Sequence, residues 1–464
     1  MMRGFLLTRR SMLFSLVGLL LTATLTIWGC GGGSSSYDDP AASAVVTTTT
    51  TQSGNALVTA AELKAWIDEG KVNAAYGSYD RVVILDVTSN ATDGTNVYTT
   101  TGHIPGAQLI SAGADAFQDY TRAEGPMDIT GSMVCTGATM DELIQSKGID
   151  QYTTIVITSS TNTINMARAY TTFRYWGFPK NRIKVLQGGN AAWTAAGYSF
   201  TSLVPAIKRS TYNVTPNGTP KVNTEMRVSL GEMIGYVKSV IAGNPNKVIV
   251  IDTVRGTNQI TTTEDLIQTT SVAANKVYTP MEGAIKGSYR YHFTSMVTSG
   301  LNFKDAATIK ADLSAALGTD NATALGDSGR DTAKTFISMC RAGNAASVGY
   351  FALDGIAYYD SNVDIKWYDG SYGQWNLLVP SDQLALNGTN AGGKLAVGSI
   401  WDTTSLMDNL TWTKDVPRNV VDYGTRVYSV EPSYAEGNQI EVTDKAYRSA
   451  SGGAAGGSAS GGGC

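Results

Sequence analysis

The residue best suited to chemistry in this sequence is Cys340, which follows the apolar segment 335–339. The β-branched and aromatic character of that segment predicts a strand, and a helix is expected to open at Ala346-Ser347. A thiol between a strand end and a helix start faces backbone N–H groups and the positive end of the helix dipole. Both favour the thiolate, so we expect Cys340 to be a nucleophile.

The residues after Cys340 predict a loop that wraps around the sulfur. Small side chains leave the backbone amides bare, and Arg341 adds positive charge for an anionic substrate. The predicted substrate-binding residues of this loop are Arg341, Ala342, Gly343, Asn344 and Ala345.

Apolar segments alternate with helical patterns along the chain, which is typical of an α/β fold with a parallel sheet. The pattern occurs twice. Each copy has a strand that ends in an acid, a glycine-containing turn, a second strand followed by a loop and a helix, and a third strand before an aromatic helix. In chain order these are 81–86, 102–107, 154–158 and 183–193 in the first copy, and 247–252, 282–287, 335–339 and 365–375 in the second.

These motifs in this order, with Gly-His-Ile-Pro-Gly-Ala at 102–107, resemble the rhodanese domain, and two copies resemble the tandem thiosulfate and 3-mercaptopyruvate sulfurtransferases. The resemblance covers about residues 57–380. It implies two rhodanese-like domains, at 57–205 and 222–380, each a mainly parallel sheet with helices on both faces. It places the catalytic cysteine at Cys340 and the substrate-side cation at Arg341, with Arg255 as a supporting residue.

The family chemistry needs no metal and no cofactor. The thiolate takes the outer sulfur of a small anion such as thiosulfate, and a thiophilic acceptor then removes it from the persulfide. The first domain is expected to be inactive, because Thr, Ser and Asn fill its loop at 158–163. Rhodanese-like phosphatases carry an arginine six positions after the cysteine; Ala346 stands there, which disfavours that activity.

The composition disfavours metal binding and nucleic-acid binding. The two histidines and four scattered cysteines disfavour a metal site. A net charge of −4 disfavours nucleic acid as a partner. His103 is interpreted as a structural turn residue and Cys135 as a packing residue. Three interpretations of Cys464 stay open: a thiol that accepts sulfur, a disulfide tether to a partner, or a residue without a role.

The N-terminal sequence has the pattern of an export signal. Arg3, Arg9 and Arg10 precede the apolar run 12–28, and the cysteine that follows resembles a bacterial lipobox. We therefore expect a signal peptide at 1–29, lipidation of Cys30, a flexible tether at 30–56 and a location on the bacterial cell envelope. An uncleaved membrane anchor is the alternative, and Thr8 to Leu13 also resembles a twin-arginine signal.

Residues 381–448 extend beyond the family resemblance, and 449–464 form a Gly/Ser tail. The extension is either a strap over the two domains or a docking surface for an envelope protein partner. The second option supports another function, a non-catalytic accessory or scaffold lipoprotein of an envelope complex that serves electron transfer. A sulfur relay or thiol-redox carrier is a third hypothesis.

Overall fold

The computed structural model describes the following parts of the chain: residues 54–127, 132–214, 222–243, 248–254, 276–277, 281–317, 335–375, 378, 398–412, 419–420 and 437–449. The predicted signal peptide, the tether up to residue 53, the Gly/Ser tail from residue 450 and three residues with predicted roles, Cys30, Arg255 and Cys464, lie outside these ranges.

A parallel sheet forms the centre of the first repeat. Its strands lie in the order β1-β7-β6-β2-β3, and all neighbours are parallel. The strand β2, between β6 and β3, is buried on both faces, as expected for an apolar run that ends in one acid, Asp86. The strands are β1 (Leu57–Val58), β2 (Val82–Asp86), β3 (Gln108–Leu109), β6 (Thr154–Thr158) and β7 (Ile183–Leu186).

The second repeat has the same arrangement with four parallel strands, in the order β11-β8-β12-β13. The register is also the same, because Asp86 lies beside Thr158 in the first sheet and Asp252 beside Met339 in the second. Its strands are β8 (Val248–Asp252), β11 (Tyr289–Arg290), β12 (Thr335–Met339) and β13 (Asp364–Trp367).

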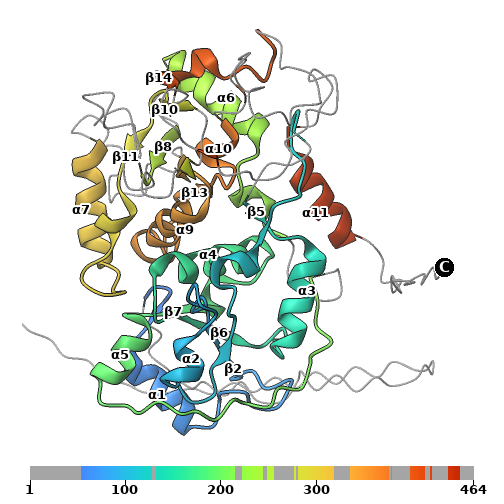
Figure 1. The fold of residues 1–464 in the computed structure, drawn as a ribbon, viewed down its shortest axis with the longest axis vertical. Coiled ribbons are helices and arrows are strands. Elements are labelled where there is room, and N and C mark those ends of the chain that lie inside the picture. Colours follow the sequence, from blue (N-terminus) through green and yellow to red (C-terminus); the bar gives the residue numbers. More distant parts are fainter. Residues whose placement is uncertain are drawn as a thin grey trace, which may run out of the picture. The chain divides into compact units, whose positions relative to one another are not determined.

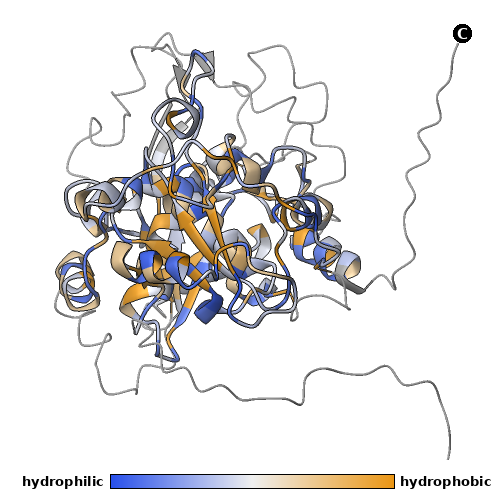
Figure 2. Cartoon of the chain, turned by 90° about the horizontal axis from the view of Figure 1, so that it is seen from below, coloured by the Kyte–Doolittle hydropathy of each residue, from blue (hydrophilic) through white to orange (hydrophobic). Residues whose placement is uncertain are grey.

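Helices cover both faces of the first sheet. On one face α1 (Ala60–Asp68), α2 (Val97–Thr100) and α5 (Gly189–Ala195) pack with alternate strand residues in one apolar cluster. On the other face α3 (Gly137–Ser146) and α4 (Thr163–Tyr175) pack in another. Figure 2 shows the resulting pattern, in which hydrophobic strands lie inside helices of mixed hydropathy.

The second sheet is covered in the same way. The helix α6 (Leu230–Ile241) and α10 (Ser371–Trp375) pack on one face. On the other face lie α7 (Ala306–Leu317) and α9 (Asn344–Tyr350), which continues directly into a π-helix over Phe351–Ala357. The predicted α/β fold, with two mainly parallel sheets and helices on both faces, is confirmed.

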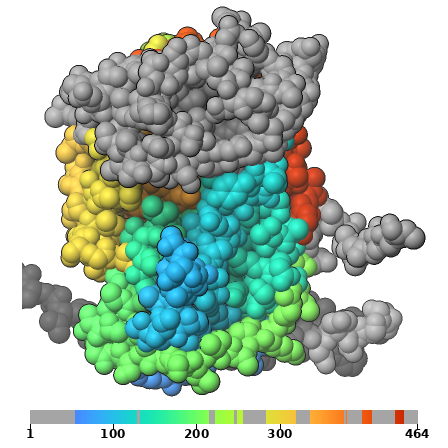
Figure 3. Space-filling view, in the orientation of Figure 1, coloured from blue at the N-terminus to red at the C-terminus, as the bar shows by residue number. Residues whose placement is uncertain are grey.

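The two repeats share one hydrophobic core. The cluster beneath α4 is continuous with the one beneath α9, and these two helices pack against each other (Figure 1). The described start of the link between the repeats, residues 201–214, runs over the surface of the first repeat, where it appears in light green in Figure 3. There Arg209 forms an ion pair with the exposed Glu142 of α3.

The described parts of the extension belong to the folded unit. The strand β14 (Met407–Trp412) pairs antiparallel with β10 (Met281–Ile285), so part of the segment predicted as a turn at 282–287 is a strand. The helix α11 (Gln439–Ser449) lies beside α3 (Figure 1). On α11, Asp444 forms a buried ion pair with Arg122, which lies in the first repeat before β5.

Several short elements complete the described chain. They are β4 (Gln118–Asp119) with β5 (Met133–Val134), β9 (Lys276–Val277) with β15 (Asn419–Val420), and single helical turns at Gly113–Phe117, Lys180–Arg182, Thr224–Met226, Phe293–Met296 and Thr404–Leu406.

Candidate active site

Cys340 lies directly after β12, where the sheet ends and the chain turns into α9. The N–H groups of Ala342 and Gly343 both point at its sulfur, at N···S distances of 3.3 and 3.1 Å. Hydrogen bonds from backbone amides stabilise a sulfur that carries negative charge. The side chain is 3% exposed. The loop therefore forms the amide cradle that the sequence predicts.

Gly343 gives the loop its shape. Its φ is 81°, in the left-handed region that favours glycine, and it caps the N-terminus of α9. A Cβ placed there would overlap the backbone of Asp369, whose Cα would lie 2.9 Å away. Only a residue without a side chain lets the loop approach the chain after β13 this closely.

The segment after β13 supports the loop from the other side. The N–H of Cys340 donates to the hydroxyl of Ser371 at 3.1 Å, and that hydroxyl lies 3.9 Å from the sulfur. The carboxylate of Asp369 accepts the N–H of Gly370 at 3.0 Å and pairs with the buried Arg227 at 2.9 Å. A buried ion pair thus fixes the turn that carries Ser371.

The other predicted loop residues differ in the burial of their side chains. The side chains of Arg341 and Ala345 are buried, and those of Ala342 and Asn344 are partly exposed. The carbonyl of Arg341 accepts the N–H of Gly373 at 2.6 Å, which ties the loop to α10. Nothing in the structure tests the predicted substrate contacts of these residues.

A further cation reaches this loop from the first repeat. Arg168 of α4 is fully buried, and its Nη1 lies 3.5 Å from the side-chain oxygen of Asn344. Its guanidinium stacks 4.5 Å above the ring of Trp367, and Trp367 donates to the carbonyl of Gly343 at 3.1 Å. The site is therefore built by both repeats.

The first repeat keeps the loop but has no thiol in it. The aligned registers place Ser159 where Cys340 stands, and the N–H of Thr161 donates to its hydroxyl at 3.2 Å. A serine hydroxyl is not ionised at neutral pH and forms no persulfide. The position is equivalent in structure, but it lacks the thiol.

Two other residues interpreted from the sequence are buried. Cys135 is fully buried, which raises its pKa to about 12 and leaves it a neutral thiol. His103 stacks on Tyr98 with 3.6 Å between ring centroids and contacts the carbonyl of Leu203. Both environments agree with structural roles.

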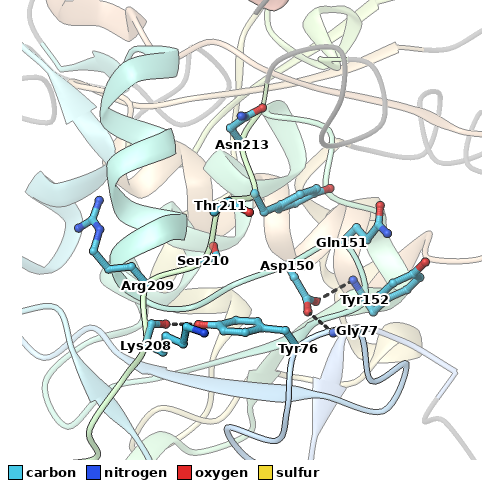
Figure 4. A pocket seen from close by; sticks show the side chains of 11 residues that line it. Tyr76, Gly77, Asp150, Gln151, Tyr152, Lys208, Arg209, Ser210, Thr211 and Asn213 are labelled. Carbon is cyan, nitrogen blue, oxygen red and sulfur yellow. Dashed lines mark hydrogen bonds between the residues drawn. The ribbon is translucent and has the colours of Figure 1, made fainter. Parts of the chain in front are cut away.

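A separate cavity of about 460 Å³ lies in the first repeat (Figure 4). The ring of Tyr76 lines it, and the Tyr76 hydroxyl donates to the carbonyl of Lys208. The carboxylate of Asp150 accepts the N–H groups of Gly77 and Tyr152. Cys340 is not among its lining residues, so it is not the site described above. Within the described ranges, no cluster of histidine, cysteine and carboxylate side chains is placed to hold a metal.

Comparison with known families finds a match for the first repeat. Residues 59–196 match the model of the rhodanese-like domain. The match spans the first repeat and less than half of the chain. The second repeat, which lies outside that match, has the same strand order and register and carries the cysteine.

The curated relatives are distant but span most of the tandem unit. The chain is 25% identical over 279 residues to the "Sulfur carrier protein TtuD" of Thermus thermophilus, covering 60% of this chain and 84% of the relative. It is 23% identical over 302 residues to a "Putative thiosulfate sulfurtransferase" of Saccharopolyspora erythraea, covering 65% and 89%. Its distant homologues are therefore sulfurtransferases and sulfur carrier proteins.

Two solved structures also resemble the chain. The Tum1 protein of Saccharomyces cerevisiae has a TM-score of 0.49 and 18% identity, covering 70% of this chain and 95% of its own. SseA of Escherichia coli, described as a 3-mercaptopyruvate sulfotransferase, has a TM-score of 0.45 and 20% identity, covering 68% and 98%.

Sequence reasoning did not find Arg168, Ser371 or Asp369 at this site. A signal existed for the first, since Arg168 stands between two alanines on a helix that packs in the core. A lone charge at a buried helical position needs a partner, but the sequence does not say where that partner lies.

Proposed function

We propose that the protein is a sulfurtransferase that carries sulfane sulfur as a persulfide on Cys340. The supporting observation is the pair of backbone amides on the sulfur, at 3.3 and 3.1 Å. An amide cradle at a strand end favours the ionised form that can attack and carry sulfur.

The proposed reaction has two displacements. The Cys340 thiolate attacks the outer sulfur of thiosulfate or a similar anion, a new S–S bond forms, and the donor's S–S bond breaks with its electron pair leaving on sulfite. A nucleophilic acceptor, cyanide or a thiolate, then attacks the terminal sulfur and the electron pair returns to Cys340. Neither step changes the overall redox state or needs a metal.

The test is thiosulfate:cyanide transfer by the purified protein. Cys340→Ser is expected to abolish thiocyanate formation, and Cys135→Ala, which removes the other described thiol, is expected to retain it. Mass spectrometry after thiosulfate treatment is expected to find one added sulfur, about 32 Da, on the Cys340 peptide. Equal turnover by Cys340→Ser and the unchanged protein would remove the assignment.

A second candidate, an accessory or scaffold lipoprotein of an envelope complex, is favoured by the burial of Cys340 and by the serine at the equivalent position of the first repeat. Purification from membranes separates the two functions. A stable complex without turnover supports the scaffold, whereas turnover by the isolated protein supports the enzyme.

The proposed location is the bacterial cell envelope, through a lipid on Cys30. The basic residues before the apolar run 12–28 motivate it. No helix in the described ranges has the length and apolar character needed to span a membrane. Cys30→Ser is expected to move the protein from the membrane fraction to the soluble one; unchanged membrane association would contradict lipidation.

A further inference from the structure

The helix α11 of the extension contacts both repeats. Towards the second repeat, Glu441 of α11 pairs with the buried Arg227, which lies just before α6. Towards the first repeat, the hydroxyl of Tyr447 donates to Asp141 of α3 at 2.6 Å, and its ring packs edge-on against Trp176 with 6.5 Å between ring centroids. The extension is therefore anchored to both halves of the tandem unit.

Arg227 sets one positive charge against three acids of the described chain. Its guanidinium contacts the carboxylates of Glu124 at 2.7 Å and Asp369 at 2.9 Å, and it also contacts that of Glu441. All four side chains are buried. With the three acids ionised, this cluster would hold two uncompensated negative charges away from water, which is costly. At least one of the acids must therefore hold a proton.

Glu441 is the acid of this cluster that is least able to carry its charge. The Glu124 carboxylate also accepts the side-chain amide of Gln374 at 3.0 Å. The Asp369 carboxylate also accepts the N–H of Val134 at 2.9 Å. One oxygen of Glu441 contacts the guanidinium, whereas the other, Oε2, is buried without a hydrogen-bond partner. Such a site favours the protonated acid, and burial raises the pKa of Glu441 to about 8.

The other ionisable groups near the cluster do not replace this proton. Asp444 of α11 is already paired with Arg122. Tyr175 and Tyr368 are neutral, because burial raises their pKa values. When Glu441 releases its proton to solvent, α11 gains a negative charge against a guanidinium that already serves two other carboxylates. The docked helix is then held less tightly than the protonated one.

The same guanidinium holds the turn beneath the Cys340 loop. Asp369 pairs with Arg227, and Ser371, two residues further on, accepts the N–H of Cys340 at 3.1 Å. The backbone of Asp369 also lies against Gly343, whose N–H points at the sulfur. Because α11 contacts this guanidinium directly, its departure lets water reach the pair with Asp369, and an ion pair that water screens is weaker.

We propose that α11 is a proton-gated strap on the active-site loop: it is docked while Glu441 carries a proton, and its release at alkaline pH weakens the ion pair that positions the Cys340 loop. This rests on the proposed function and names a regulation of that same site. Arg227 is a positioning residue in it, since it acts on the loop through Asp369.

The test is hydrogen–deuterium exchange of the full chain between pH 6 and pH 8, with each rate divided by the intrinsic exchange rate at that pH. Two peptides are followed by mass spectrometry, one from α11 and one that contains the turn 369–373. The protection of α11 is expected to fall at least about tenfold over this range, because the docked helix holds a proton that the released helix gives up. The turn peptide is expected to lose protection in parallel.

Glu441→Gln keeps the shape of the side chain and cannot ionise, so the protection of α11 in this variant is expected to stay constant from pH 6 to pH 8. Glu142→Gln is the matched control, because it neutralises an exposed glutamate on α3, the helix beside α11. Its exchange is expected to follow that of the unchanged protein.

Three outcomes would overturn the proposal. The first is an α11 whose protection in the unchanged protein does not depend on pH. The second is a loss of α11 protection without any change in the turn peptide. The third is the same pH dependence in Glu441→Gln as in the unchanged protein.

The pH series on the unchanged protein decides even if Glu441→Gln does not fold, because the first two outcomes need no variant. Exchange needs neither a sulfur donor nor turnover. The proposed function therefore fails through activity in Cys340→Ser, whereas the strap fails through exchange, and the two failures are distinguishable.

Discussion

The backbone N–H of Cys340 donates to the side-chain oxygen of Ser371 at 3.1 Å. Ser371 in turn donates to the carbonyl of Tyr368 at 2.7 Å, so one hydroxyl joins the backbone of Cys340 to the turn after β13. Ser371 also has a φ of 51°, which a residue with a Cβ adopts at some cost. The hydrogen bonds of Ser371 therefore hold this residue in a backbone conformation that costs free energy.

Replacing Ser371 separates the hydrogen bond from the strain. Ser371→Ala is expected to lower the free energy of unfolding by roughly 1–2 kcal/mol, because the buried N–H of Cys340 loses its acceptor. Ser371→Gly loses the same bond but relieves the left-handed backbone, so we expect it to be about 1 kcal/mol more stable than Ser371→Ala. Urea unfolding measures the stability of both variants. If Ser371→Gly were less stable than Ser371→Ala, the backbone strain at residue 371 would be contradicted.

Gly343→Ala is expected to disrupt the cradle. The added methyl would meet the backbone of Asp369 at a φ of 81°, so the loop must move and the two N–H···S contacts must lengthen. Thiocyanate formation should fall by about 100-fold or more, as for other losses of oriented backbone donors. The control is Gly197→Ala, which has a φ of 82° but open space around its Cβ position. It is expected to cost about 1 kcal/mol of stability and no activity.

The buried carboxylates around Arg227 predict a pH dependence of stability. Burial, together with repulsion from Glu124 and despite attraction by Arg227, raises the pKa of Glu441 to about 8. Between its unfolded value near 4.5 and pH 8, the folded state holds a proton that the unfolded chain has released.

The stabilisation from that proton is therefore complete below about pH 4.5 and is lost as pH rises to 8. For this single group the free energy of unfolding falls by up to about 1.4 kcal/mol per pH unit. Glu441→Gln is expected to flatten the decline between pH 6 and 8 in urea titrations. An equally steep decline in that variant would assign the proton to another group.

The ion pair between Arg122 and Asp444 predicts how strongly α11 is held. Both side chains are buried, and the Asp444 carboxylate also accepts the hydroxyl of Tyr175 at 2.6 Å. Asp444→Asn leaves Arg122 without its counter-ion, and we expect a loss of about 3–5 kcal/mol in thermal or urea unfolding.

Glu142→Gln provides the comparison for this pair. It breaks the exposed pair with Arg209 and is expected to cost less than about 1 kcal/mol. Similar losses in Asp444→Asn and Glu142→Gln would show that α11 contributes little to the folded unit.

Local patterns in the sequence predicted the sheets and the cysteine loop. The mostly apolar runs at 81–86, 154–158 and 335–339 correspond to β2, β6 and β12, because a strand buried on both faces is rich in apolar residues. The position of Cys340 at a strand end follows from the same runs. These features depend on neighbours in sequence, so a single chain reveals them.

The features that the sequence did not predict depend on contacts between residues far apart in the chain. Arg168 reaches Asn344 across 176 positions, and Arg122 reaches Asp444 across 322. The helix α11 buries two acids, Glu441 and Asp444, against buried arginines, and charged side chains are ordinarily found at the surface. Nothing local marks such residues as interior ones.

The buried pairs also bear on how the chain is made. Arg122 is synthesised 322 residues before Asp444, and Glu124 103 residues before Arg227. At roughly 5–20 residues per second, a nascent first repeat waits roughly 15–60 s for the helix that neutralises Arg122. During translation that half of the protein exposes unmatched charges beside apolar surface, and this interval is when a ribosome-bound chain most needs protection from aggregation.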